Sequence, residues 1–474
     1  MIQSDLNEFF QDAFSDKRIN RRAALFLSSL IKNGSAVVNK CFDMHSDKIS
    51  SYRLLNNKKC DIANISKALY KSCISNIEGD HYLCLQDTTE LNYSSHLNRI
   101  GNADLNIGPC SNEKIGGYFC HPMLVVDANK NMPIGFSSIK LWNRTWDKKS
   151  KKERKYNTLP IEKKESNRWI DSVVKTREII PTDSCITIIG DRESDIYEAL
   201  CSIPRENTHL LIRSSSNRIL CDENIRLLDK MRSCEIQHSY EVKIKGNKSR
   251  KSRVACIDLR FTTVEIKRPG STVGDYQASV KMQCIYVLEQ AHTIPKGEEP
   301  IEWRLLTSHE VDSIEKAMQC VQWYRSRWYI EELFRLLKTQ GLNIEASQLE
   351  QGQSLKKLML FSLQAALQLM IIKIAYDNKD EESPAKILFS NEQMKFLKII
   401  LPTLEGKTEK QKNPFVSGSL AWAAWIIAKL GKWNGYTTQS PPGYITMKNG
   451  MDIFYLKYDT FLLTCQAMQD VYKE

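Results

Sequence analysis

The sequence lacks the short motifs that mark several common classes of enzyme and metal site. It contains neither a Walker phosphate-binding loop nor a G-x-S-x-G nucleophile elbow. The eight histidines show no metal-ligand spacing, so we expect them to be surface or core residues. The 14 cysteines include no C-x-x-C pair, and neighbours are at least ten positions apart. This spacing argues against a zinc site and favours reduced thiols of an intracellular protein.

Long apolar runs and a leader peptide are also missing. The most apolar run extends from Leu358 to Ile372 and includes Gln364 and Gln368. A membrane span needs about 20 apolar residues, so this run predicts a buried helix. The opening Met-Ile-Gln-Ser-Asp has neither a basic region nor an apolar core. We therefore expect a cytoplasmic protein without a signal peptide or a membrane partner.

The composition is that of an ordinary globular protein with an excess of positive charge. The 474 residues are 42% hydrophobic and 26% charged, with a formal net charge of +11. This length favours two to four domains. The charge indicates an anionic partner without identifying it, because a ribosome-associated factor or a basic enzyme could carry the same balance.

The pattern of apolar residues changes along the chain. Residues 1–75 predict short helices, one of which covers residues 20–33 and ends at Gly34. Residues 215–306 predict an all-β segment, and the chain that follows this segment predicts helices. A further helix is predicted to start at Asp195. Apolar runs predict further strands over residues 81–87, 117–127, 133–142, 185–191, 208–213 and 303–308.

The most informative segment extends from Tyr324 to Lys338 and contains the pattern Tyr-x2-Arg-x3-Glu-x6-Lys. On one continuous helix, Tyr324, Arg327, Glu331 and Lys338 would lie within about 60° of one another. One carboxylate beside two cations and a phenol suits a metal-binding acid next to groups that hold phosphates. The alternative is a solvated helix face with an i,i+4 ion pair.

Two further acids follow apolar strands. Asp87 follows residues 81–86, and Asp191 follows residues 185–190. A single acid in this position commonly forms a turn or caps a helix. Together with Glu331, however, the two aspartates could form a cage of three carboxylates. Such cages hold the two divalent cations of nucleic-acid phosphoryl transfer, and hard oxygen ligands favour Mg²⁺ or Mn²⁺.

These residues together resemble the DDE transposases of bacterial insertion sequences, specifically the IS-four family. The matching residues are Gln86-Asp87-Thr-Thr, Gly190-Asp191-Arg-Glu-Ser-Asp-Ile, and the Tyr324 to Lys338 pattern. The resemblance covers nearly the whole chain. It implies an α/β protein whose ribonuclease-H-like, DDE integrase-type catalytic core spans residues 76–345. A β insertion over residues 215–306 would lie within this core, between a helical DNA-end-binding domain (1–75) and a helical dimerisation domain (346–474).

The resemblance also implies roles for individual residues. Asp87, Asp191 and Glu331 would be catalytic and would bind two Mg²⁺ or Mn²⁺ ions per active site. Trp303 would stack on a base flipped out of the DNA, for which the alternative is a core tryptophan. The residues implied to bind DNA phosphates are Tyr324, Arg327, Lys338 and Arg213. The basic residues implied to recognise the DNA ends are Lys17, Arg18, Arg21, Arg22 and Arg53.

The implied activity is cut-and-paste transposition. The enzyme would bind the terminal inverted repeats of its insertion sequence and cleave by metal-dependent hydrolysis and 3′-hydroxyl attack through a DNA hairpin. It would then join the ends to target DNA as a homodimer in the nucleoid of a bacterium, with dimer contacts around Trp422 and Trp425. Two alternatives stay open: a catalytically silent DNA-end-binding repressor or inhibitor, and a ribonuclease-H-like nuclease without strand transfer. The basic tracts 148–155 and 243–253 are consistent with either DNA contacts or solvated loops.

Overall fold

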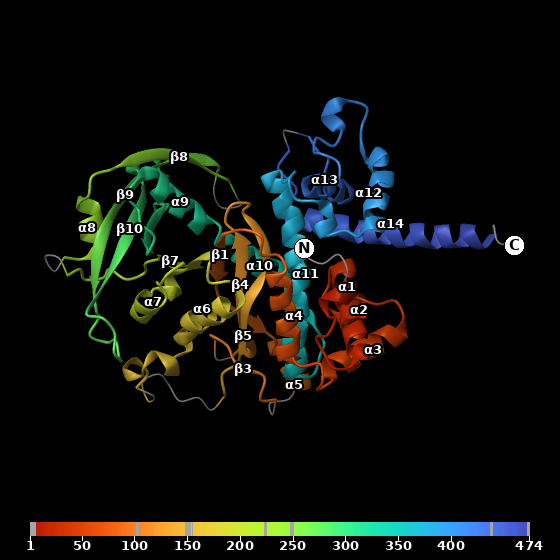
Figure 1. The fold of residues 1–474 in the computed structure, drawn as a ribbon, viewed down its shortest axis with the longest axis horizontal. Helices are drawn as coiled ribbons and strands as arrows, with labels where there is room; N and C mark the ends of the chain where they lie inside the picture. The colour runs from red at the N-terminus through yellow and green to blue at the C-terminus, as the bar shows by residue number, and fades with distance from the viewer. Residues whose placement is uncertain are drawn as a thin grey trace. The chain divides into compact units, whose positions relative to one another are not determined.

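The computed structural model describes residues 6–100, 104–112, 114–146, 153, 155–221, 225–246, 251–436 and 439–471. Most of the basic tract 148–155 and the centre of the tract 243–253 lie outside these residues. The chain is a mixed α/β protein with an 11-stranded mixed sheet, which confirms the predicted α/β class (Figure 1). It divides into two compact units. Unit 1 comprises residues 1–78, 88–147 and 330–474, and unit 2 comprises residues 79–87 and 148–329.

Unit 1 is mainly helical and surrounds one long buried helix. Helix α11 (Gly352–Asn378) contacts α2, α3, α4, α13, α14 and strand β5 (Figure 1). By length and composition α11 is the one helix among the described residues that could cross a membrane, yet its most apolar window is wholly buried. The prediction of a buried helix over Leu358 to Ile372 is therefore confirmed. The other helices of this unit are α1 (Leu6–Phe9), α2 (Lys17–Asn33), α3 (His45–Asn56), α4 (Ile62–Ile74), α5 (Leu97–Ile100), α12 (Asn391–Leu404), α13 (Leu420–Leu430) and α14 (Tyr444–Val471).

The N-terminal helices of unit 1 form as their sequence predicts. Asp16 caps the start of α2 by accepting a hydrogen bond from the backbone of Arg18. Gly34 ends α2 in the left-handed conformation, with a φ of 50°. Helix α2 has one apolar face, on which Phe26, Leu27 and Leu30 are fully buried. Helix α2 packs against α11.

The strands of unit 1 are β2 (Thr89–Asn92), β3 (Gly108–Pro109), β4 (Gly116–Asp127) and β5 (Met132–Trp142). Strand β4 pairs antiparallel with β2, β3 and β5. The turn between β4 and β5 is closed by Asp127, whose Oδ1 accepts hydrogen bonds of 2.9 Å from the backbones of Asn129 and Lys130. The predicted hairpin is therefore confirmed.

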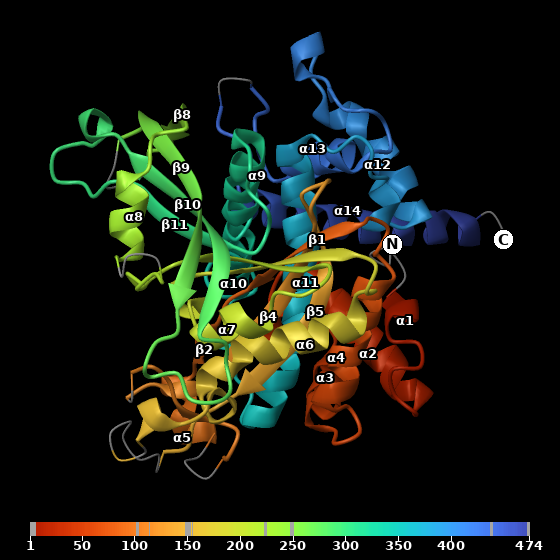
Figure 2. The same ribbon diagram turned by 60° about the vertical axis from the view of Figure 1, so that its left-hand side comes forward.

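Unit 2 has a parallel centre that continues into an antiparallel extension. Its strands are β1 (His81–Gln86), β6 (Cys185–Gly190), β7 (Thr208–Arg213), β8 (His238–Ile244), β9 (Arg253–Lys267), β10 (Ser279–Glu289) and β11 (Glu302–Thr307). They lie in the order β1-β6-β7-β11-β10-β9-β8. Strands β1, β6 and β7 are parallel, and every later pair in this order is antiparallel. Figure 2 shows the long β9 and β10 strands of the extension.

The helices of unit 2 are α6 (Arg168–Ile179), α7 (Tyr197–Ser202), α8 (Leu227–Ser233) and α9 (Ile314–Arg325). Helix α10 (Trp328–Leu337) has its first two residues in unit 2 and the rest in unit 1. Helix α8 corrects the prediction that residues 215–306 are all-β. Leu227 and Met231 lie one helical turn apart and are both fully buried where α8 packs against β9. The helix predicted to start at Asp195 starts instead at Tyr197, because the Asp195 carboxylate binds the segment that follows β7.

Two further predictions about helices are wrong. The segment from Tyr324 to Lys338 is not one helix, because α9 ends at Arg325 and α10 begins at Trp328. Within unit 1, Trp422 and Trp425 are only 2% and 3% exposed, so these side chains are core residues of α13 and are not available as dimer contacts. An apolar helix buried on all sides looks the same in sequence whether its own chain or a partner covers it.

Candidate active site

The two aspartates are brought together by the parallel pairing of β1 and β6. Leu85 pairs with Ile189, and each aspartate lies two residues further along its strand. Asp87 and Asp191 therefore directly follow the carboxyl ends of two neighbouring parallel strands, and both lie at the same edge of the sheet. This edge is the usual place for ligands in sheets of this kind.

The chain turns sharply after β6 because Gly190 has no side chain. A Cβ on Gly190 would clash with the hydroxyl of Ser194 and lie 2.7 Å from its Cβ. This close approach allows a short 3-10 helix (Arg192–Ser194) to follow at once. Asp191 caps this helix by accepting a 2.8 Å hydrogen bond from the backbone of Glu193. The capping role, which is the simpler interpretation of the sequence, therefore holds for one carboxylate oxygen of Asp191.

Arg327 lies beside the first aspartate. Its Nη1 is 3.7 Å from Oδ2 of Asp87, and the two side chains are 16% and 19% exposed. The turn that holds Arg327 is built from short-range hydrogen bonds: its backbone N–H donates to Tyr324, and that of Tyr329 donates to Ser326. The break between α9 and α10 thus places Arg327 in a turn, where the guanidinium can face an anion and a carboxylate together.

Tyr324 and Trp303 form the aromatic part of the site. Their rings meet edge to face, with centroids 5.2 Å apart and an angle of 69°. The Arg327 guanidinium lies 5.8 Å from the centroid of the Tyr324 ring. Burial raises the pKa of Tyr324, whereas the positive charges of Arg327 and Arg213 oppose that increase. The phenol therefore stays protonated and can donate a hydrogen bond.

Arg213 ends strand β7 on the same face of the sheet as Trp303. Arg213 pairs with Leu305, and Trp303 lies two residues from Leu305 on β11, so all three side chains share one face. Nη2 of Arg213 donates a 2.7 Å hydrogen bond to the carbonyl of Glu302. Burial lowers the pKa of Arg213, and the neighbouring charges of Arg192 and Arg327 lower it further. Unit 2 thus concentrates positive charge next to its two aspartates.

Glu331 and Lys338 belong to unit 1. Glu331 lies in the first turn of α10, and Lys338 directly follows the last residue of that helix. Nζ of Lys338 donates a 2.7 Å hydrogen bond to the carbonyl of Glu90 and lies 3.8 Å from Oε1 of Glu345. Among the described residues, no group of three or more His, Cys, Asp and Glu side chains is arranged to hold a metal ion. The strand pairing of unit 2 therefore unites two of the three predicted carboxylates.

The basic residues predicted to recognise DNA ends lie on α2 and α3. Arg18 is paired with Asp16 at 3.1 Å, and Arg22 is paired with Asp47 of α3 at 3.3 Å. The Arg22 pair joins two helices, so this side chain has a structural role as well. Four of the five predicted residues have exposed side chains, namely Lys17, Arg18, Arg21 and Arg53.

Sequence reasoning missed a cluster of three histidines in unit 2. The rings of His209 and His309 stack with centroids 3.8 Å apart. The hydroxyl of Thr187 lies 2.8 Å from Nε2 of His81 and 2.7 Å from Nε2 of His309. Burial lowers the pKa of His309 to about 3, and the two neighbouring histidines contribute to this decrease. The three residues are far apart in sequence, so no spacing could have revealed them.

Comparison of the chain with models of known protein families gives no match.

Proposed function

We propose that the chain is a DNA transposase of the DDE type, similar to the IS-four family, with a ribonuclease-H-like catalytic core. The observation that carries the proposal is the parallel pairing of β1 and β6, which sets Asp87 beside Asp191 at one sheet edge. Strand β7 extends the parallel order and supplies Arg213 next to them. The order β1-β6-β7 with acids after the first two strands supports a ribonuclease-H-like core.

The donor set of the site fits a hard divalent cation. Asp87 and Asp191 offer carboxylate oxygens, which Mg²⁺ and Mn²⁺ prefer. In the proposal Glu331 contributes the third carboxylate from α10, four residues after Arg327. A bound pair of cations would lower the pKa of a nucleophilic hydroxyl and neutralise the leaving oxygen.

The residues of unit 2 supply the remaining requirements of phosphoryl transfer. At each step an oxygen of water or of a 3′ hydroxyl forms a bond to phosphorus, and a deoxyribose oxygen leaves. Arg327 and Arg213 would neutralise charge on the phosphate, and the buried, protonated Tyr324 would donate a hydrogen bond to it. Trp303, whose ring meets the Tyr324 ring edge to face, would offer its indole to an unstacked base.

The exposed end of α14 supports a homodimer. Its buried side chains, such as Met451 and Phe454, lie in the first half of the helix. In the second half Leu462, Leu463 and Met468 are exposed. Exposed apolar side chains concentrated on one segment are typical of protein interfaces. We therefore assign the dimer contact to this part of α14 in place of Trp422 and Trp425.

The test uses a linear duplex that carries the DNA flanking the gene, including its terminal inverted repeats. Incubation with Mg²⁺ or Mn²⁺ should yield nicked DNA, then hairpin ends, and finally ends joined to a target plasmid on denaturing gels. Tight binding without any nicking would favour an end-binding repressor. Nicking without hairpins or joined products would favour a nuclease without strand transfer, and the absence of both binding and cleavage would refute the proposal.

A further inference from the structure

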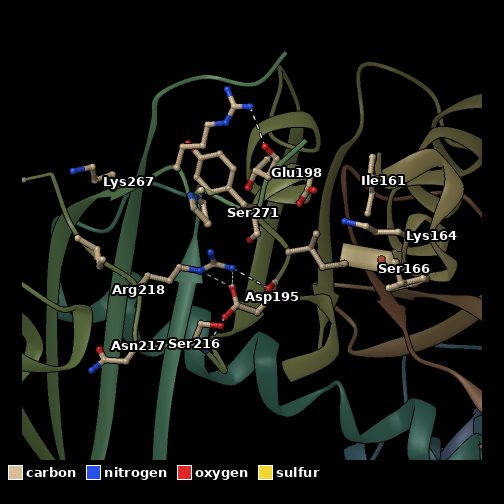
Figure 3. Close-up of a pocket in the computed structure, with 18 residues that line it drawn as sticks. Ile161, Lys164, Ser166, Asp195, Glu198, Ser216, Asn217, Arg218, Lys267 and Ser271 are labelled. Atoms are coloured by element: carbon tan, nitrogen blue, oxygen red, sulfur yellow. Dashed lines mark hydrogen bonds and ion pairs between the residues drawn. The ribbon is translucent and has the colours of Figure 1, made fainter. Parts of the chain in front are cut away.

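A large cavity opens in unit 2 next to the candidate active site. Its volume is about 790 Å³, which lies in the range of pockets that hold a ligand the size of a nucleotide, ~300–1,000 Å³. Four segments of unit 2 line it: residues 156–166, 195–198, 216–219 and 267–272 (Figure 3). None of these residues belongs to the set that the sequence assigns to catalysis.

One wall of the cavity is a buried ion pair. The Asp195 side chain is 0% exposed and accepts hydrogen bonds from Nε and Nη2 of Arg218, whose side chain is 7% exposed (Figure 3). The same carboxylate accepts hydrogen bonds from the backbone N–H groups of Ser215 and Ser216, at 2.9 and 3.0 Å. Asp195 lies four residues after Asp191, and Ser215 lies two residues after Arg213. This wall is therefore built from the segments that directly follow Asp191 and Arg213 in the chain.

The remaining charged groups give the cavity an excess of positive charge. The guanidinium of Arg268 is held by the carbonyls of Thr272, Gly274 and Tyr276, which are neutral acceptors. In the described part of the chain, neither Lys164 nor Lys267 forms an ion pair, and both line the cavity.

Two acids line the cavity, and they leave this excess in place. Asp195 is compensated by Arg218, and Glu198 is the second acid. The three remaining cations are Lys164, Lys267 and Arg268, and the one acid left to balance them is Glu198. Hydroxyl groups of Ser166, Ser271 and Thr272 lie among them.

We propose that this cavity binds phosphate groups of a DNA strand that passes through the candidate active site. Lysine ammonium groups, an arginine held by carbonyls and short hydroxyl side chains are groups that position a nucleic-acid backbone without reading its sequence. The inference rests on the proposed function, because that function supplies the strand. It adds Lys164 and Lys267 as residues that contribute affinity and do not take part in the chemistry.

The test compares the double variant Lys164→Ala/Lys267→Ala with a matched control in the same unit. Lys230→Ala/Lys281→Ala removes one half-buried and one exposed lysine outside the cavity, as the first pair does inside it. Binding of a fluorescent duplex from the DNA flanking the gene is measured by anisotropy over a range of salt concentrations without divalent cations. Loss of two phosphate contacts should reduce the slope of log K against log salt by about 2.

The cavity variant should show the reduced slope while the control keeps the wild-type slope. Equal slopes for the wild type and both variants would overturn the proposal, even if the wild type cleaves DNA and the proposed function stands. Calorimetric titration with dAMP forms a second arm. Binding of dAMP that the cavity variant loses, with an unchanged DNA slope, would identify a site for free nucleotides and would overturn the DNA assignment. A wild-type protein without salt-dependent DNA binding would refute both proposals.

Discussion

Replacing Asp195 with asparagine should destabilise unit 2 strongly. The substitution keeps the shape of the side chain but removes the charge that compensates the buried guanidinium of Arg218. It also places an amide, which can donate, among at least three groups that donate hydrogen bonds to the carboxylate. Loss of one partner from a buried ion pair costs about 3–5 kcal/mol. We expect a loss of this size, whereas Asp275→Asn at an exposed position should change stability by less than about 0.5 kcal/mol.

Native-state hydrogen exchange measures this loss where it occurs. The backbone amides of Ser215 and Ser216 should lose most of their protection in Asp195→Asn, and urea unfolding should report the global loss. The double variant Asp195→Asn/Arg218→Met removes both charges and should recover part of the stability. A loss below about 1 kcal/mol in the single variant, or unchanged protection of the two amides, would refute the structural role assigned to Asp195.

Three other substitutions follow from the structure. Burial lowers the pKa of Lys356 from its usual 10.5 to about 8. Between these two pH values the unfolded chain binds a proton that the folded chain does not bind, so the free energy of unfolding of the wild type should rise with pH. Urea titrations measure this rise, and Lys356→Met should remove it. His309 has a pKa of about 3 in the folded chain, so its contribution to stability is complete above pH 6.5 and is lost as pH falls towards 3. His309→Gln should therefore reduce the fall in melting temperature at acid pH. An unchanged fall would contradict the view that His309 is buried in its neutral form. Leu463 on α14 is 66% exposed, so Leu463→Asp should lower the dimer fraction at least tenfold in sedimentation-velocity runs while the melting temperature stays unchanged; equal dimer fractions would exclude this surface as the interface.

The central strands could be predicted from sequence because local residues determine them. Strands β1, β6 and β7 are short apolar runs bounded by polar residues, and their observed ends agree with the prediction within one residue. The acids after β1 and β6 were visible for the same reason. Their mutual alignment needed only the parallel pairing of the two strands.

Other features depend on contacts that no local pattern reveals. Neither glycine nor proline marks the helix break at Ser326 and Arg327, so the periodicity of the segment predicted one continuous stripe. Asp195 and Arg218 are 23 residues apart and meet only because β6 and β7 pair in parallel. Helix α8 has only seven residues, which is too short for periodicity to distinguish it from the surrounding strands.

The most direct test of the account is metal-dependent cleavage of the element's own ends by carboxylate variants. Asp87→Asn, Asp191→Asn and Glu331→Gln should each lower the cleavage rate at least a hundredfold while binding of the ends is retained. Asp80 and Asp183 lie just before the first residues of the same two strands, at the ends away from the candidate active site. The control variants Asp80→Asn and Asp183→Asn should therefore cleave DNA at the wild-type rate. Undiminished cleavage by any variant of the first three, in a protein that binds its ends normally, would contradict the central claim.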